Sequence, residues 1–141
     1  VMSADRALLF GVMADTTLNP GRSFPPSGSL EPRDVRPDGT VDVFASMQRE
    51  LMEETGLDFT SLRHGETFAI FDGRRLAVAC MAFADQSYAA LAAQATGFIA
   101  AQTHAELARV EAVRSCADIG ADMPPYAQEI VRRVFATSVC D

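Results

Sequence analysis

Three glutamates and an arginine between residues 49 and 54 are of the types, and at the spacing, that a metal site requires. Glu50, Glu53 and Glu54 follow one another at intervals of three and one, which places their carboxylates on one face of a helix. Like charges at this spacing repel, by roughly 0.2–0.5 kcal/mol per pair in water. Oxygen ligands that converge from one face suit a hard divalent cation such as Mg²⁺ or Mn²⁺. The pattern therefore favours a metal site, and a solvated helix face is the simpler alternative.

A helix over residues 42–55 must carry these side chains. Asp42 is a suitable N-cap, and Gly56 stands where a left-handed C-cap is expected. The apolar positions form one stripe that we expect to be buried, namely Phe44, Met47 and Leu51. Arg49 lies beside the glutamates, where it can pair with Glu53 one turn later or orient a carboxylate of the preceding loop.

Residues 49–57 resemble the second half of the Nudix box, the sequence motif of the Nudix hydrolase family. The family pattern is Arg-Glu-aliphatic-x-Glu-Glu-x-Gly-aliphatic, and this chain reads Arg-Glu-Leu-Met-Glu-Glu-Thr-Gly-Leu. Every fixed position of the half-box is filled. The match is specific because it requires seven residues of particular chemistry within nine positions.

The first half of the box departs from the family pattern. Gly28 and Asp34 have the spacing of the family's glycine and glutamate, but an aspartate replaces the glutamate. Fourteen residues, rather than the usual seven, separate Asp34 from Arg49. Turn-forming residues at 37–39 (Pro-Asp-Gly) accommodate the additional length, so we predict a loop insertion before the helix.

The resemblance implies an α/β fold, a Nudix-type α/β/α sandwich with a mixed β-sheet, in which the box forms a loop–helix–loop. Residues 1–141 would form a single domain of this type. The implied reaction is hydrolysis of a diphosphate bond in a nucleoside diphosphate linked to another moiety, with Mg²⁺ or Mn²⁺ as cofactor. The substrate would be a small nucleotide diphosphate derivative of unidentified structure. The alternative is a Nudix-like nucleotide-binding or regulatory domain without turnover, and a homodimer is compatible with either.

The resemblance also assigns roles by position. The catalytic residues would be Glu53, Glu50 and Arg49, with Arg49 holding a box carboxylate in a salt bridge. The metal ligands would be Glu50, Glu53, Glu54 and the backbone of Gly28. The weaker candidates for substrate binding are Arg22, Glu31 and Glu106, each of which is otherwise an ordinary surface charge. Glu111 is a second choice for the acidic residue after the box, and we favour Glu106.

Hydrophobic patterning predicts the remaining elements. The expected strands span 6–13, 66–71, 75–83 and 106–113, and the expected helices span 87–102 and 124–136. Prolines in residues 23–28 favour an ordered loop there. Asp72-Gly73 predicts a hairpin turn, and Thr96-Gly97 predicts a break in the preceding helical pattern.

Composition narrows the function classes. The chain has 141 residues, 48% of them hydrophobic, a net charge of −7 and twelve arginines but no lysine. An acidic domain of this kind is poorly suited to general nucleic-acid binding. Apolar runs are too short for a membrane span, and we expect no signal peptide. Cys80, Cys116 and Cys140 have no CxxC spacing, so we expect a reduced, cytoplasmic protein.

Overall fold

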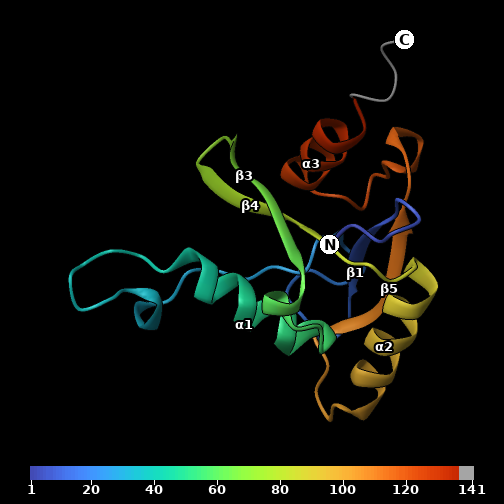
Figure 1. The fold of residues 1–141 in the computed structure, drawn as a ribbon, viewed down its shortest axis with the longest axis horizontal. Helices are drawn as coiled ribbons and strands as arrows, with labels where there is room; N and C mark the ends of the chain where they lie inside the picture. Colours follow the sequence, from blue (N-terminus) through green and yellow to red (C-terminus); the bar gives the residue numbers. More distant parts are fainter. Residues whose placement is uncertain (137–141) are drawn as a thin grey trace.

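Residues 1–136, which the computed structural model describes, form two small antiparallel sheets and three helices (Figure 1). The first sheet has the strand order β2-β1-β5, with bounds Ser23–Phe24, Leu8–Met13 and Leu107–Val113. The second sheet is a hairpin of β3 and β4, which span Arg63–Asp72 and Arg75–Phe83. The helices are α1, α2 and α3, spanning Val43–Thr55, Tyr88–Ala101 and Pro125–Phe135. Strands and helices mix along the described chain, which confirms the predicted α/β class.

The first residues of the chain join the two sheets. Met2 forms an antiparallel bridge with Leu8 and a parallel bridge with Phe83. All the pairings between named strands are antiparallel. Within residues 1–136, the mixed sheet that we predicted is therefore limited to the one parallel bridge at Met2.

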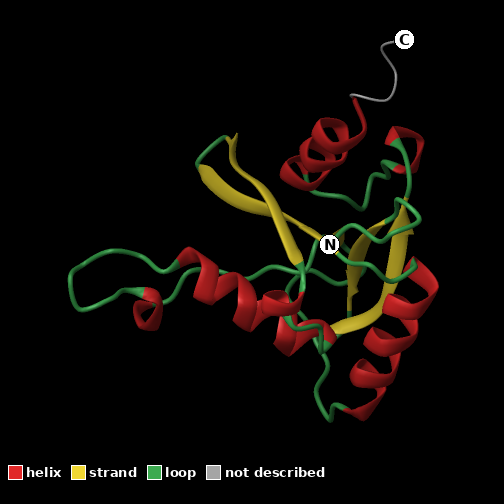
Figure 2. Ribbon diagram, in the orientation of Figure 1, coloured by secondary structure: helices red, strands yellow, loops and turns green. Residues whose placement is uncertain are grey.

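Strand β1 is buried along its whole length, and its two faces contact different hydrophobic clusters. Phe10 packs in a cluster with Val131 of α3. Leu9 points to the opposite face, as alternate strand residues do, and packs with Leu51 of α1 and Leu91 of α2. The helices thus lie on both sides of the first sheet, as Figure 2 shows.

Helix α1 has the predicted caps, and of its predicted buried stripe Leu51 is buried, Met47 is half-buried and Phe44 is exposed. Asp42 accepts a hydrogen bond from the Ala45 N–H at 3.0 Å, and Gly56 has a φ of 69° in the left-handed region. The prediction that Phe44 lies in the core is wrong, because its side chain is 48% exposed. The first turns of α1 extend away from the sheets, so only the second half of the helix finds a core to pack against (Figure 1). Its buried residues are Ser46, Leu51, Glu54 and Thr55.

Two other predictions need correction. Residues 23–28 are not wholly a loop, because Ser23–Phe24 form the edge strand β2 before the two prolines begin. Helix α2 continues without a break through Thr96-Gly97, since its alanine-rich sequence and its contacts with β5 and β1 outweigh the low helix propensity of one glycine.

The hairpin is longer than predicted at its β3 end, and its turn is shifted by one residue. Asp72 pairs with Arg75, so the two-residue turn is Gly73-Arg74, with Gly73 at a φ of 60°. None of the described helices is long and apolar enough to cross a membrane. Cys80 and Cys116 are free thiols, and Cys140 lies outside the described residues.

Candidate functional site

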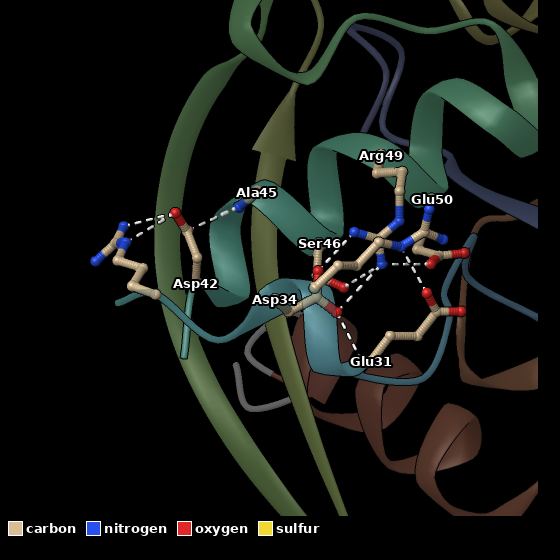
Figure 3. A network of polar contacts seen from close by, with 9 residues as sticks. Glu31, Asp34, Asp42, Ala45, Ser46, Arg49 and Glu50 are labelled. Carbon is tan, nitrogen blue, oxygen red and sulfur yellow. Dashed lines mark hydrogen bonds and ion pairs between the residues drawn. The ribbon is translucent and has the colours of Figure 1, made fainter. Parts of the chain in front are cut away.

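Arg49 connects helix α1 to the loop that precedes it (Figure 3). Its Nη1 lies 2.6 Å from Oδ1 of Asp34, and its Nη2 lies 3.3 Å from Oδ2 of the same carboxylate. The same Nη2 also donates to Oε1 of Glu50 at 3.1 Å and to the hydroxyl of Ser46 at 3.2 Å. Of the two partners that the sequence left open for Arg49, the structure therefore shows the loop carboxylate. Glu50 is a further partner, from the adjacent position of the helix.

Asp34 is a buried anion at the base of this network. It is 3% exposed and accepts a 2.7 Å hydrogen bond from the Glu31 N–H. The hydrogen bonds from Arg49, followed by the Glu31 N–H, lower the pKa of Asp34 to about 2. The Asp34 and Glu50 hydrogen bonds in turn raise the pKa of Arg49 above its usual value. The pair therefore stays ionised over the ordinary pH range, and it fixes the Arg49 side chain beside Glu50.

Glu54 is a buried carboxylate on the next turn of α1. It is 4% exposed, and its Oε2 accepts a hydrogen bond from the Ser27 N–H at 3.1 Å. Burial, with smaller contributions from the charges of Glu106, Glu50 and Glu53, raises the pKa of Glu54 to about 8, while the hydrogen bond from the Ser27 N–H opposes the shift. Burial and the charges of three other carboxylates thus disfavour ionisation of Glu54.

Gly28 lies directly against the carboxylate of Glu50. A Cβ atom at Gly28 would be 2.1 Å from the Glu50 Cδ, a separation that no pair of nonbonded carbons tolerates. Burial raises the pKa of Glu50 as well, with smaller contributions from Glu53 and Glu106 and opposition from Arg49. The absence of a side chain at Gly28 is therefore what allows the loop backbone to reach the glutamates.

The structure brings some of the predicted site residues together and leaves others apart. Glu106 is exposed just before β5, and its charge raises the pKa values of both Glu50 and Glu54. Glu53 is exposed on α1. Glu31 is exposed and pairs with Arg33 at 2.5 Å, so its side chain is directed to the loop surface.

Two further candidates lie outside this group. Arg22 is exposed directly before β2 and forms no ion pair within the described part of the chain. Glu111 accepts a short hydrogen bond from the buried hydroxyl of Ser23, and its Oε2 lies 3.5 Å from Nη2 of Arg109. These partners give Glu111 a local role between β5 and β2.

Tyr126 is a site residue that the sequence did not predict. It lies in the first turn of α3, where its ring packs at 6.3 Å from the ring of Phe24. Burial raises the pKa of Tyr126, while the Ser27 side chain and the charge of Arg75 lower it and the charge of Glu54 contributes a small increase. Tyr126 is 72 residues from Glu54 along the chain, so no local pattern could have placed it here.

The carboxylates are not assembled into a complete ligand set. Among residues 1–136, no group of three or more His, Cys, Asp or Glu side chains is arranged to hold a metal ion. Comparison with known proteins adds no assignment, because no protein-family model and no curated protein sequence matches this chain. The site must therefore be interpreted from its own chemistry.

Proposed function

We propose that this protein hydrolyses a diphosphate bond in a nucleoside diphosphate linked to another moiety, with a divalent cation held by α1. The observation that carries the proposal is the buried Glu54 carboxylate, which lies among the charges of Glu50, Glu53 and Glu106. A buried anion surrounded by anions requires a proton or a cation as its partner. Arg49, the arginine of the same helix, is already engaged by Asp34 and Glu50. The resemblance of residues 49–57 to the Nudix half-box supports the same interpretation.

The donor chemistry fits Mg²⁺ or Mn²⁺. Glu50 and Glu54 would hold the ion from successive turns of α1, with Glu53 on the same side of the helix and the Gly28 backbone against Glu50. When bound, such an ion neutralises phosphate charge and lowers the pKa of an attacking water. The described carboxylates do not already form a metal cage, so a substrate phosphate would supply part of the coordination, as is usual for Mg²⁺.

The chain's own groups would position the metal ligands and accept the proton of the attacking water. Asp34 and Arg49 fix the Glu50 carboxylate, and the Ser27 N–H fixes that of Glu54. Glu53 is the most exposed of the three glutamate carboxylates on α1. We therefore assign it the role of the general base that accepts the proton of the attacking water. Glu106 is the alternative acceptor, since its charge influences both Glu50 and Glu54.

A hydrolysis assay tests the proposal. Nucleoside diphosphates linked to sugars, to a second nucleoside or to other groups would be incubated with Mg²⁺ or Mn²⁺ and assayed for new phosphate monoesters. We expect metal-dependent turnover that falls by about a hundredfold in Glu54→Gln, the scale of a lost electrostatic catalyst. Asp38→Asn, which removes a carboxylate from the exposed turn of the same loop, is the matched control and should keep full activity. An inert protein whose melting temperature rises with nucleotides would instead indicate the binding-domain alternative.

A further inference from the structure

A cavity of about 520 Å³ lies at the base of the β3–β4 hairpin. It is bounded by the first residues of the chain, the paired ends of β3 and β4 and the end of α3, which lies beside the hairpin (Figure 1). Among residues 1–136, it shares none with the candidate site on α1. Its volume is in the range of cavities that hold a small organic molecule.

The hydrophobic core forms part of the cavity wall. Met2 is buried, and Met81, Phe83 and Val134 are half-buried and pack against the same hydrophobic cluster. A wall of this kind offers no hydrogen-bonding partner to a bare ion. It suits the apolar body of a larger ligand.

Arginines form the polar part of the wall. The guanidinium carbon of Arg63 lies 4.3 Å from the centre of the Phe83 ring, and that of Arg133 lies 4.5 Å from the centre of the Phe68 ring. A guanidinium that lies on a ring keeps its opposite face for a second planar group and its N–H edges for an anion. The cavity is therefore suited to a ring-shaped ligand that carries an acidic group.

The charge balance of the wall differs from that of the whole chain. Three arginines and two carboxylates line the cavity, so one positive charge is in excess, whereas the chain has a net charge of −7. Arg133 forms a short ion pair with Glu66, which is one of these carboxylates. Within the described residues, Arg63 forms no salt bridge. An anion can therefore engage its N–H groups.

Arg6, the third arginine of the wall, has an unusual backbone conformation. Its φ of 59° is the one positive value at a residue other than glycine within residues 1–136. The surrounding turn holds this conformation, because the Arg6 N–H donates to the Ser3 carbonyl at 3.1 Å and the Ala7 N–H donates to the Ser3 hydroxyl at 3.0 Å. Backbone positions of this kind are concentrated at ligand sites, where they aim a side chain.

We propose that this cavity binds an organic anion with an apolar, ring-sized body. Its acidic group would be held by Arg6 and Arg63, and its body would lie against Met2, Met81 and Val134. Charge-assisted hydrogen bonds would select the acidic group, and burial of apolar surface would select the body. The site is separate from the carboxylates of α1 and does not depend on the proposed hydrolysis.

Two fluorescent probes that differ in one group provide the test. Anilinonaphthalene sulfonate has two ring systems and an acidic group, and phenylnaphthylamine has the same rings without the acid. Each is titrated into the full chain in EDTA. We expect saturable binding of the sulfonate that weakens by about tenfold in Arg63→Gln and in Arg6→Ala, with the affinity of the neutral probe unchanged in both variants.

Two further variants separate the cavity from the rest of the surface. Ala4 is an exposed residue of the cavity wall, so Ala4→Trp should fill the cavity and weaken both probes. Arg132→Gln is the matched control, because it removes the same charge from the neighbouring position of α3 and Arg132 lies outside the cavity. Melting temperatures establish that each variant is folded.

Four outcomes would overturn the proposal. They are no saturable binding of the sulfonate by the wild-type protein, wild-type affinity in both Arg63→Gln and Arg6→Ala, an equal loss of the neutral probe in these variants, and an equal loss of the sulfonate in Arg132→Gln. The assay contains no divalent metal and measures no turnover. Its result therefore stands whether or not the protein hydrolyses diphosphates.

Discussion

The two ends of the segment from residue 27 to residue 42 are built in different ways. At the inner end, Ser27 and Gly28 contact Glu54 and Glu50 of α1, more than twenty residues further along the chain. At the outer end, the exposed turn formed by residues 36–40 is closed by its own backbone and by Asp38. Asp34 lies between them and anchors the segment to Arg49.

This difference indicates where added sequence is tolerated. The outer turn lies within the fourteen residues that separate Asp34 from Arg49, and it contacts little beyond itself and Asp42. A self-contained surface turn lengthens a loop at small thermodynamic cost. The inner end cannot vary in this way, because its backbone is fitted against the half-buried carboxylate of Glu50 and the buried carboxylate of Glu54.

The largest effect is expected at the inner glycine. Gly28→Val would place side-chain atoms where the Glu50 carboxylate lies, so either the loop or Glu50 must move. We expect kcat/KM for metal-dependent diphosphate hydrolysis to fall by about a hundredfold or more, because a displacement of about 1 Å in a catalytic group has effects of that size. Steady-state kinetics with the best substrate of the panel measures it. Near-normal kinetics in Gly28→Val would show that the contact with Glu50 has no catalytic importance.

A smaller loss is expected at the anchor between the two ends. Asp34→Asn keeps the size of the side chain but removes the charge that holds Arg49. Arg49 would then be free to shift away from Glu50, and we expect kcat to fall by about tenfold, the effect of one charge-assisted contact. Kinetics of this variant should show the loss mainly in kcat, with KM little changed. A pure KM effect would instead place Asp34 in substrate binding.

Acid stability should depend on the same anchor. Since the pKa of Asp34 is lowered to about 2 in the folded protein, the unfolded chain binds more protons at this group as the pH falls below about 4. The stabilisation from Asp34 is therefore present above pH 4 and is lost as the pH falls toward 2. Urea denaturation at pH 6, 4 and 2.5 should show a smaller acid-induced loss in Asp34→Asn than in the wild-type protein. Parallel losses in the two proteins would contradict the assignment.

The smallest effect is expected at the outer turn. Gly39 has a φ of 86°, and no atom beyond its two chain neighbours would lie within 4 Å of a Cβ added there, so Gly39→Ala introduces backbone strain without a tertiary clash. We expect a loss of about 1 kcal/mol in the free energy of unfolding, with unchanged hydrolysis. Denaturation and kinetics on the same preparation measure both quantities. A loss of activity here would remove the distinction between the inner and outer ends.

Local sequence patterns predicted the parts of the fold that depend on local chemistry. These parts are the caps at Asp42 and Gly56, the turn at residues 37–39 and the antiparallel hairpin. They follow from side-chain hydrogen bonding and from glycine's access to positive φ. The position of Phe44 could not be predicted in this way. An apolar stripe shows which face of a helix is buried, but it does not show how much of the helix length other elements cover. Phe44 lies in the part of α1 that they do not cover.

The candidate site shows the same division. Helix periodicity predicts the row of glutamates with Arg49 beside it. The sequence left two possible partners for Arg49, namely Glu53 and a carboxylate of the preceding loop. The burial of Glu54 and the approach of Tyr126 depend on tertiary packing between α1, the loop and α3, for which one sequence contains no local signal. The roles of Arg22, Glu31 and Glu106 remain predictions.

The most direct measurement of the central claim is calorimetric titration of Mn²⁺ into the wild-type protein, Glu50→Gln and Asp38→Asn. The claim predicts saturable binding that weakens by at least about tenfold in Glu50→Gln, because a carboxylate ligand is lost, and that is unchanged in Asp38→Asn. Absence of saturable binding to the wild-type protein, or equal affinity in all three proteins, would contradict a metal site on α1.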